Sequence, residues 1–219
     1  MFESNCSLRQ DAIITADSLV AMIEKEQRAY RCNDYFAPLR GVPEAVTHVD
    51  RQQLVDWCFA IIDACKFQRE TVAIAVNLFD RFLSIPSQKS ITALQDKREL
   101  QLLAVTSLYI GIKINERVAF PSTFFETISN GGYSFQEIEE TERIMLRGLR
   151  WRINGPTLFQ IAMHILSLLN LQEFLDQDVM NCLLNDVQYQ TENAIRDYDL
   201  SISRPSTVVL TMLFRSFQH

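Results

Sequence analysis

The segment from residue 97 to residue 114 limits most strongly what this chain can fold into, because its apolar residues surround nearly the whole circumference of a helix. They are Leu100, Leu102, Leu103, Ala104, Val105, Leu108, Tyr109, Ile110 and Ile112. A helix that is apolar on almost every side is normally surrounded by other helices. Its apolar run is shorter than the roughly 20 residues that a membrane span needs. We therefore expect it to be the central helix of a bundle.

The sequence on both sides of this segment also predicts helices. Apolar residues recur with the i, i+3, i+4, i+7 spacing of one helical face, and Ser134 with Glu137 forms a capping-box pattern. Only 6 Gly and 6 Pro occur, which leaves few turns, and no convincing alternating strand appears. We therefore expect an all-α fold. The other helices are expected at about 18–31, 49–66, 69–84, 121–129, 134–149, 157–170, 174–196 and 205–218.

Three regions follow from this pattern. Residues 1–48 are expected to be a lead-in, weakly ordered over 1–16, with one helix at about 18–31 and a loop after it. Residues 49–153 are expected to form a five-helix bundle, with a loop from Ile85 to Lys97. After Asn154-Gly155, residues 154–219 are expected to form a second helical domain. That domain ends directly after an amphipathic stretch, so we expect it to be incomplete.

Composition and charge exclude several classes of protein. The net charge of -6 is unlike the basic surface of a nucleic-acid binder. The five cysteines are odd in number and no signal peptide opens the chain, so we expect no disulfide framework. Cys58 and Cys65 lie seven positions apart on one helical face, and we expect them to be two buried thiols. No CxxC or Cys/His cluster suggests zinc. We expect no metal, no cofactor, no nucleic acid and no membrane.

Catalytic motifs are also missing from the sequence. It contains neither a P-loop, nor G-x-G-x-x-G, nor a G-x-S-x-G elbow. Glu139, Glu140 and Glu142 cluster in one predicted helix, which is typical of a solvated face. A helical enzyme that uses Glu142 would need a second catalytic group, and none is evident. The sequence therefore predicts a protein that is not an enzyme.

Several charges lie inside otherwise apolar helices. Arg51 and Asp80 lie in the first two helices of the expected bundle, Lys113 ends the central helix, and Glu142 lies in the fifth. Spacing alone leaves two interpretations open. The charges could pair with one another inside the fold, where desolvation nearly offsets attraction. Alternatively, some of them could face a partner.

Four motifs, taken in order, resemble those of one known family. Residues 51–57 read R-x-x-L-V-D-W, and residues 75–84 closely follow A-V-N-x-x-D-R-F-L-S. Residues 113–116 have the form K-x-x-E at the end of the central helix. Further matching positions are Tyr133, Ser134, Glu142, Leu146, Leu149, Pro156 and Thr157. Together these motifs resemble the cyclin box, and the resemblance extends over about residues 17–219.

The resemblance to cyclins implies both a fold and a function. The fold would be two successive five-helix cyclin folds, of which the second here lacks its last two helices. The protein would be a regulatory subunit that binds and activates a cyclin-dependent Ser/Thr protein kinase in cell-cycle control. It would form a heterodimer with that kinase in the nucleus, the cytoplasm or both, and would meet the kinase's substrates or inhibitors there.

The resemblance also assigns roles to individual residues. Lys113 and Glu142 match the pair that hydrogen-bonds the kinase backbone, and Glu116 completes the K-x-x-E motif as a further kinase-binding residue. Arg51 and Asp80 match an internal ion pair that ties the first two helices together.

A substrate-docking groove on the first helix is only partly retained. Leu54, Trp57 and Gln101 match the groove of several cyclins. Asp50, Gln53 and Ala60 replace the methionine, isoleucine and glutamate of that groove. We therefore expect an eroded groove.

One feature bears on the subclass. The stretch from Glu24 through Tyr30 to Phe36 resembles the lead-in of G1-type cyclins.

The alternative to a kinase-activating subunit is a cyclin-fold adaptor in transcription, acting with a transcriptional kinase or as a general-factor-like core. A DNA-binding adaptor would present a basic face, and both the net charge of -6 and the absence of a zinc ribbon count against it.

Overall fold

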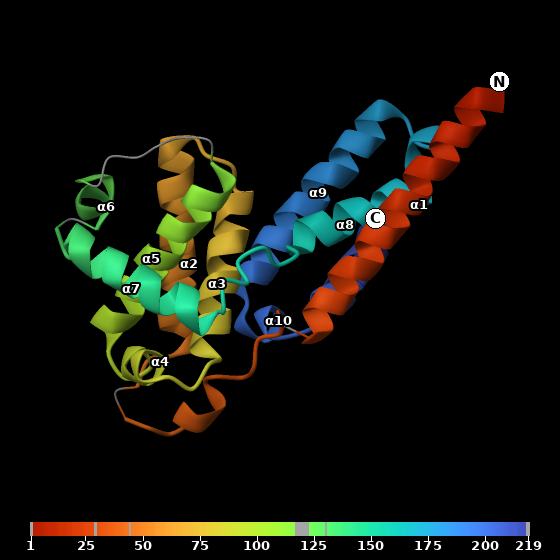
Figure 1. The fold of residues 1–219 in the computed structure, drawn as a ribbon. Coiled ribbons are helices and arrows are strands. Elements are labelled where there is room, and N and C mark those ends of the chain that lie inside the picture. Colours follow the sequence, from red (N-terminus) through yellow and green to blue (C-terminus); the bar gives the residue numbers. More distant parts are fainter. Residues whose placement is uncertain (1, 29, 44, 117–122, 130, 218–219) are drawn as a thin grey trace. The chain divides into compact units, whose positions relative to one another are not determined.

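The computed structural model describes the chain except for residues 1, 29, 44, 117–122, 130 and 218–219 (Figure 1). Every regular element of the described residues is a helix, which confirms the all-α class. The helices are α1 (Phe2–Arg28), α2 (His48–Cys65), α3 (Glu70–Leu83), α4 (Gln88–Ala93), α5 (Lys97–Asn115), α6 (Thr123–Ile128), α7 (Phe135–Gly148), α8 (Leu158–Leu169), α9 (Gln177–Arg196), α10 (Tyr198–Ser201) and α11 (Pro205–Ser216). Two single 3₁₀ turns span Ala37–Leu39 and Leu171–Glu173.

The contacts divide the chain into two compact units. The central unit comprises Cys32–Asn154 and Ile195–Ile202, and the terminal unit comprises Met1–Arg31, Gly155–Ala194 and Ser203–His219. The domain ranges expected from the sequence stay predictions. The contacts differ from them in that α1 joins the terminal unit and the short segment 195–202 joins the central one.

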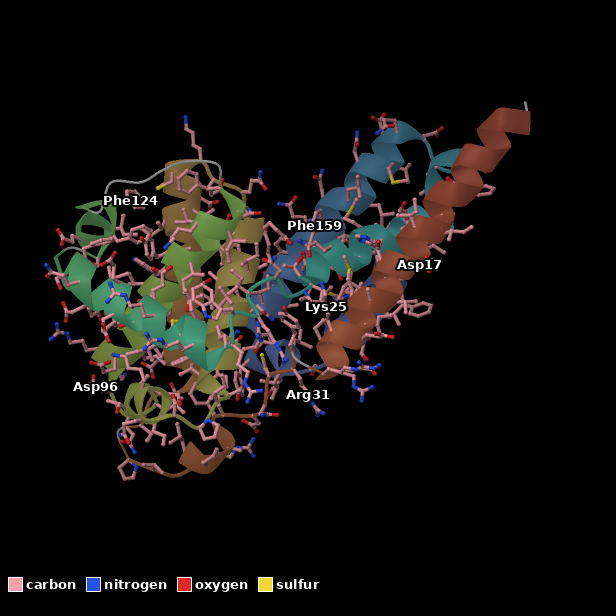
Figure 2. All side chains as sticks on the ribbon, viewed as in Figure 1. Asp17, Lys25, Arg31, Asp96, Phe124 and Phe159 are labelled. Atoms are coloured by element: carbon pink, nitrogen blue, oxygen red, sulfur yellow. The ribbon has the colours of Figure 1, made fainter. Side chains whose placement is uncertain are left out.

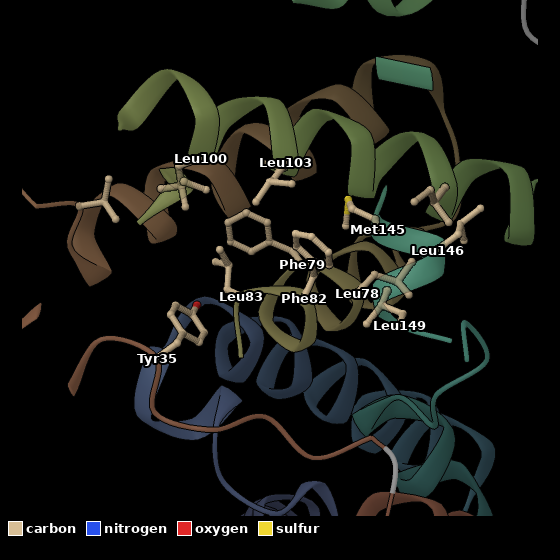
Figure 3. Packing of buried hydrophobic residues seen from close by; sticks show 14 of the residues in the cluster. Tyr35, Leu78, Phe79, Phe82, Leu83, Leu100, Leu103, Met145, Leu146 and Leu149 are labelled. Carbon is tan, nitrogen blue, oxygen red and sulfur yellow. The ribbon is translucent and has the colours of Figure 1, made fainter. Parts of the chain in front are cut away.

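The central unit is built around α5, as its all-round apolar sequence predicted. This helix packs against α2, α3, α4 and α7. Phe79 and Phe82 of α3 lie in the middle of one cluster, with Leu103 of α5 and Met145 of α7 beside them (Figure 3). Helix α5 approaches α3 closely at Gly111, where an added Cβ would stand 3.0 Å from the Thr71 carbonyl oxygen. Glycine inside this helix therefore permits the close approach of two backbones.

A buried ion pair joins the first two helices of the central unit. Arg51 and Asp80 are 0% and 2% exposed. The Arg51 guanidinium donates from Nε to Oδ1 at 2.8 Å and from Nη2 to Oδ2 at 2.7 Å. Burial would lower the pKa of Arg51, but the Asp80 carboxylate holds it above its usual value. Arg51 therefore keeps its charge, and each group depends on the other because neither reaches water.

Two further segments depend on the same ion pair. Tyr35, in the loop before α2, donates its hydroxyl to Asp80 Oδ1 at 2.8 Å. Arg51 also donates to the carbonyls of Ile195 and Arg196 at 3.0 and 3.1 Å. Burial, together with the Asp80 charge, raises the pKa of Tyr35 well above its usual value. The Arg51–Asp80 pair therefore fixes α2, α3, the preceding loop and the segment that starts at Ile195.

The terminal unit packs α1 and α11 on α8. Leu19 and Met22 of α1 pack against a core that includes Ile161 and Val209. Figure 2 labels Asp17 and Lys25 on α1 and Phe159 on α8. Glu26 is 3% exposed, and its carboxylate accepts from the Ser206 backbone N–H at 2.9 Å and from the Ser206 hydroxyl at 2.6 Å. A residue of α1 thus caps the N-terminus of α11.

Two expectations from the sequence were wrong about local structure. Helix α1 begins at Phe2, and not at about residue 18. No Gly or Pro interrupts residues 2–28, so the helix continues where its apolar pattern is weak. The expected loop from Ile85 to Lys97 contains α4. A capping box formed by Ser87 and Ser90 stabilises the start of this helix. Pro121, the expected start of another helix, lies outside the described residues.

The cap on α11 predicts a measurable loss of stability. Replacing Glu26 by Ala should lower the free energy of unfolding by about 1–3 kcal/mol, because the Ser206 N–H and hydroxyl lose their buried acceptors. Chemical denaturation measures this. The matched control is Glu24→Ala on the exposed side of α1, which should change stability by less than about 0.5 kcal/mol. Equal effects of the two variants would contradict the cap.

The buried ion pair predicts a larger loss. Asp80→Ala should cost about 3–5 kcal/mol, because it leaves the Arg51 guanidinium buried without its counter-ion. Asp56→Ala is the control, since its pair with Arg196 is half exposed and surface pairs are worth about 0–1 kcal/mol. If Asp80→Ala fails to fold, the double variant Arg51→Met with Asp80→Leu should regain a cooperative transition. Persistent unfolding of the double variant, or a small effect of Asp80→Ala, would contradict this account.

Candidate functional site

Lys113 and Glu142 meet at the surface of the central unit. Lys113 lies in the last turn of α5 and Glu142 lies on α7, which packs against α5. The Lys113 ammonium donates to Glu142 Oε1 at 2.7 Å, and the two side chains are 48% and 13% exposed. Exposed pairs of this kind contribute about 0–1 kcal/mol to stability. The structure thus brings together two residues that lie 29 positions apart in the sequence, and their contact adds little to the stability of the fold.

Lys113 is protonated at neutral pH. Partial burial would lower the pKa of Lys113, but the hydrogen bond and charge of Glu142 raise it above the usual lysine value, with help from Tyr109. The Lys113 Nζ lies 4.6 Å from the centroid of the Tyr109 ring. Sequence reasoning counted Tyr109 only as an apolar residue of the central helix. Tyr109 lies four positions before Lys113. This spacing indicates a contact between them, because residues i and i+4 are neighbours on one face of a helix.

Glu116 has its contacts elsewhere. Its Oε1 accepts from the Gln68 backbone N–H at 3.0 Å and from the Thr71 hydroxyl at 2.5 Å. These groups lie at the N-terminal end of α3, where a carboxylate is favoured by the unpaired N–H groups and the helix dipole. Within the chain, Glu116 therefore joins the end of α5 to the start of α3, and the described contacts do not bring it to the Lys113–Glu142 pair.

The residues of the expected docking groove are only partly available. Leu54 and Trp57 are half-buried and pack against the two clusters of the central core. Leu54 borders a cavity of about 10 Å³, which is room for about one water molecule. Gln101 is exposed, and its Oε1 accepts from the Tyr133 hydroxyl at 3.2 Å.

Trp151 is a surface residue that sequence reasoning missed. It is 69% exposed and follows the C-terminal end of α7, the helix that carries Glu142. Arg150 and Trp151 have φ angles of 52° and 57°, and the Trp151 N–H donates to the Leu146 carbonyl at 2.9 Å. Left-handed backbone at two successive non-glycine residues is uncommon. The helix end thus directs a large aromatic ring into solvent, where such rings serve as binding anchors.

No metal site appears in the part of the chain that the structure describes. Two thiols there, Cys32 and Cys58, are buried, whereas Cys65, which was expected to be buried, is only partly so. No group of three or more His, Cys, Asp or Glu side chains there could hold a metal ion. Burial raises the pKa of the Cys58 thiol to about 12, and burial with the Asp80 charge raises that of Cys32 further. Both thiols are therefore protonated and unreactive. No described helix is long and apolar enough to cross a membrane.

Comparison with known proteins gives one consistent result. Residues 17–154 match the family model of the cyclin N-terminal domain. The putative cyclin-A3-1 of Arabidopsis thaliana is 30% identical over 204 residues, which cover 90% of this chain and 48% of that protein. The G1/S-specific cyclin-E1 of Rattus norvegicus is 32% identical over 137 residues, covering 63% of this chain and 31% of the rat protein. The chain thus spans half or less of the length of these two relatives.

A solved structure supports the fold. The X-ray structure of a viral cyclin from herpesvirus saimiri superposes with a TM-score of 0.68, at 16% sequence identity, over 91% of this chain and 81% of that one. This likeness supports only the fold, because the sequence identity between the two chains is low. The family model covers the central helices that hold Arg51, Asp80, Lys113 and Glu142. The chain therefore belongs to the cyclin family.

Proposed function

We propose that this chain is the regulatory subunit of a cyclin-dependent protein kinase, which it binds and activates in cell-cycle control. Members of the family are generally regulatory subunits of such kinases. The observation that carries the proposal is the Lys113–Glu142 pair, an ammonium and a carboxylate held 2.7 Å apart at the surface by two packed helices. Neither side chain is fully buried, and ion pairs at the surface add little stability, so their position fits recognition better than folding.

The two groups match the chemistry of an exposed peptide backbone. The Lys113 ammonium offers three donors for carbonyl oxygens, and the Glu142 carboxylate accepts from backbone N–H groups. In the free chain each satisfies the other. Exchanging this pair for contacts with a partner costs little, because a half-exposed ion pair is weak. Trp151, at the end of the same α7 helix, supplies the exposed aromatic area that interface anchors have.

Activation then follows from a shift between two states of the kinase. An active kinase requires an ion pair between the lysine of a strand and the glutamate of a mobile helix, together with an ordered activation loop. A subunit that binds the mobile helix only in its active position shifts the population toward that state. The chain itself needs no moving part for this role. Its rigid α5 and α7 scaffold, packed through Met145 and Leu103, holds the docking groups in place.

A charge exchange tests this proposal while keeping the internal ion pair. Lys113→Glu combined with Glu142→Lys places the same two charges in reversed order, so the fold should persist. Each group would then present the wrong polarity to the kinase backbone. Truncating a buried charged contact typically costs 2–5 kcal/mol at an interface, so binding to purified cyclin-dependent kinases should weaken at least about 30-fold. Calorimetry and a peptide phosphorylation assay measure binding and activation.

The matched control exchanges the charges of an exposed pair on the same helix. Arg143 and Glu139 are 59% and 40% exposed and lie one helical turn apart on α7. Their exchange should change kinase binding by less than about threefold, because exposed pairs contribute little. Circular dichroism verifies that both double variants are folded. A folded Lys113→Glu, Glu142→Lys protein with undiminished kinase binding would refute the proposal.

A further inference from the structure

We infer that Tyr109 is a positioning residue, whose ring holds the Lys113 ammonium in the direction needed for docking. The binding test of this inference rests on the proposed kinase-binding function. The contact between Tyr109 and Lys113 does not depend on that function. Lys113 Nζ lies 4.6 Å from the centroid of the Tyr109 ring and 2.7 Å from Glu142 Oε1. A cation within about 6 Å of an aromatic centroid is attracted by the negative face of the ring. The ammonium is therefore held by two partners, one from α5 and one from α7.

The ring of Tyr109 is itself fixed by other aromatic side chains. The Phe125 ring meets it edge to face, with centroids 4.6 Å apart and an interplanar angle of 68°. Phe135 approaches it at 6.2 Å and 80°. Phe125 is fully buried and in turn contacts Phe124, which Figure 2 labels on α6. Edge-to-face contacts restrict how an aromatic ring can turn. The Lys113 site therefore depends on an aromatic cluster built from α5, α6 and α7.

Positioning matters here because a lysine side chain is long and flexible. An exposed lysine loses much rotamer freedom when it is bound in one geometry. Glu142 alone restrains the distance of the ammonium from one oxygen. The Tyr109 ring restrains it from a second side, so part of the ordering is complete before the kinase arrives. Preorganisation of this kind raises affinity without adding any contact to the partner.

The binding test is a double-mutant cycle with a conservative rescue. Tyr109→Leu should weaken binding to a purified cyclin-dependent kinase by about three- to tenfold, as expected for losing one cation–π contact. Tyr109→Phe keeps the ring face and loses only the hydroxyl, which also interacts with Lys113, so it should weaken binding less than Tyr109→Leu does. In the Lys113→Met background, Tyr109→Leu should have no further effect on the residual binding, because the cation it holds is gone.

A second readout needs no kinase. With ¹³C-labelled lysine, the ε-methylene protons of Lys113 should show an upfield ring-current shift in the free chain, and Lys113→Met assigns that signal by removing it. Tyr109→Leu should return the signal to the position of exposed lysines, whereas Tyr109→Phe should leave it in place. An unshifted signal in the wild type, or equal behaviour of the Phe and Leu variants, would overturn the inference.

The outcomes separate the inference from the proposed function. If Lys113→Met leaves kinase binding unchanged, the docking role of Lys113 fails, and with it both the proposed function and the inference for this surface. If Lys113→Met weakens binding but Tyr109→Leu weakens it equally in both backgrounds, the proposed function stands and the positioning role of Tyr109 is wrong. Thermal unfolding of each variant verifies that the comparison is made between folded proteins.

Discussion

The ion pair between Arg51 and Asp80 is the contact on which the rest of the central unit depends. A guanidinium that reaches no water needs hydrogen-bond partners inside the protein. Arg51 of α2 makes four hydrogen bonds, two to Asp80 of α3 and one each to the carbonyls of Ile195 and Arg196, while Tyr35 donates to Asp80. Such a network contributes modestly to net stability, yet strongly penalises other arrangements. It therefore fixes the positions of α2 and α3, and α3 is the helix on which α5 lies.

Lys113 and Glu142 take their positions from this scaffold. Helix α5 approaches α3 closely at Gly111, and α7 packs against α5, so the last turn of α5 lies beside Glu142. Lys113 and Glu142 then contact each other at a site where neither is buried deeply enough to stabilise the core. The same region carries Tyr109 beside the ammonium, and the end of α7 carries the exposed Trp151. Charge and aromatic surface are thus available on neighbouring helices for a partner.

Sequence reasoning succeeded where one local pattern decides the outcome. The apolar surround of residues 100–112 predicted the central position of α5, and the Ser134 capping box predicted the start of α7. It failed where no such local pattern exists. No apolar stripe marks the first residues of α1, so its early start was not predicted. The exposure of Trp151 depends on the left-handed turn that follows α7. The contact of Tyr109 with Lys113 was readable from their spacing, but its restraint by Phe125 requires the fold.

Hydrogen exchange with and without a purified cyclin-dependent kinase tests the central claim most directly, because it locates the binding surface without any substitution. The account predicts that the kinase slows exchange of backbone amides in the last turn of α5, around Lys113, and in the second half of α7 through Trp151. Exchange in the α4 region, from Ser87 to Gln95, should stay unchanged. Slowed exchange confined to other parts of the chain, with both docking segments unaffected, would contradict the assignment of this surface.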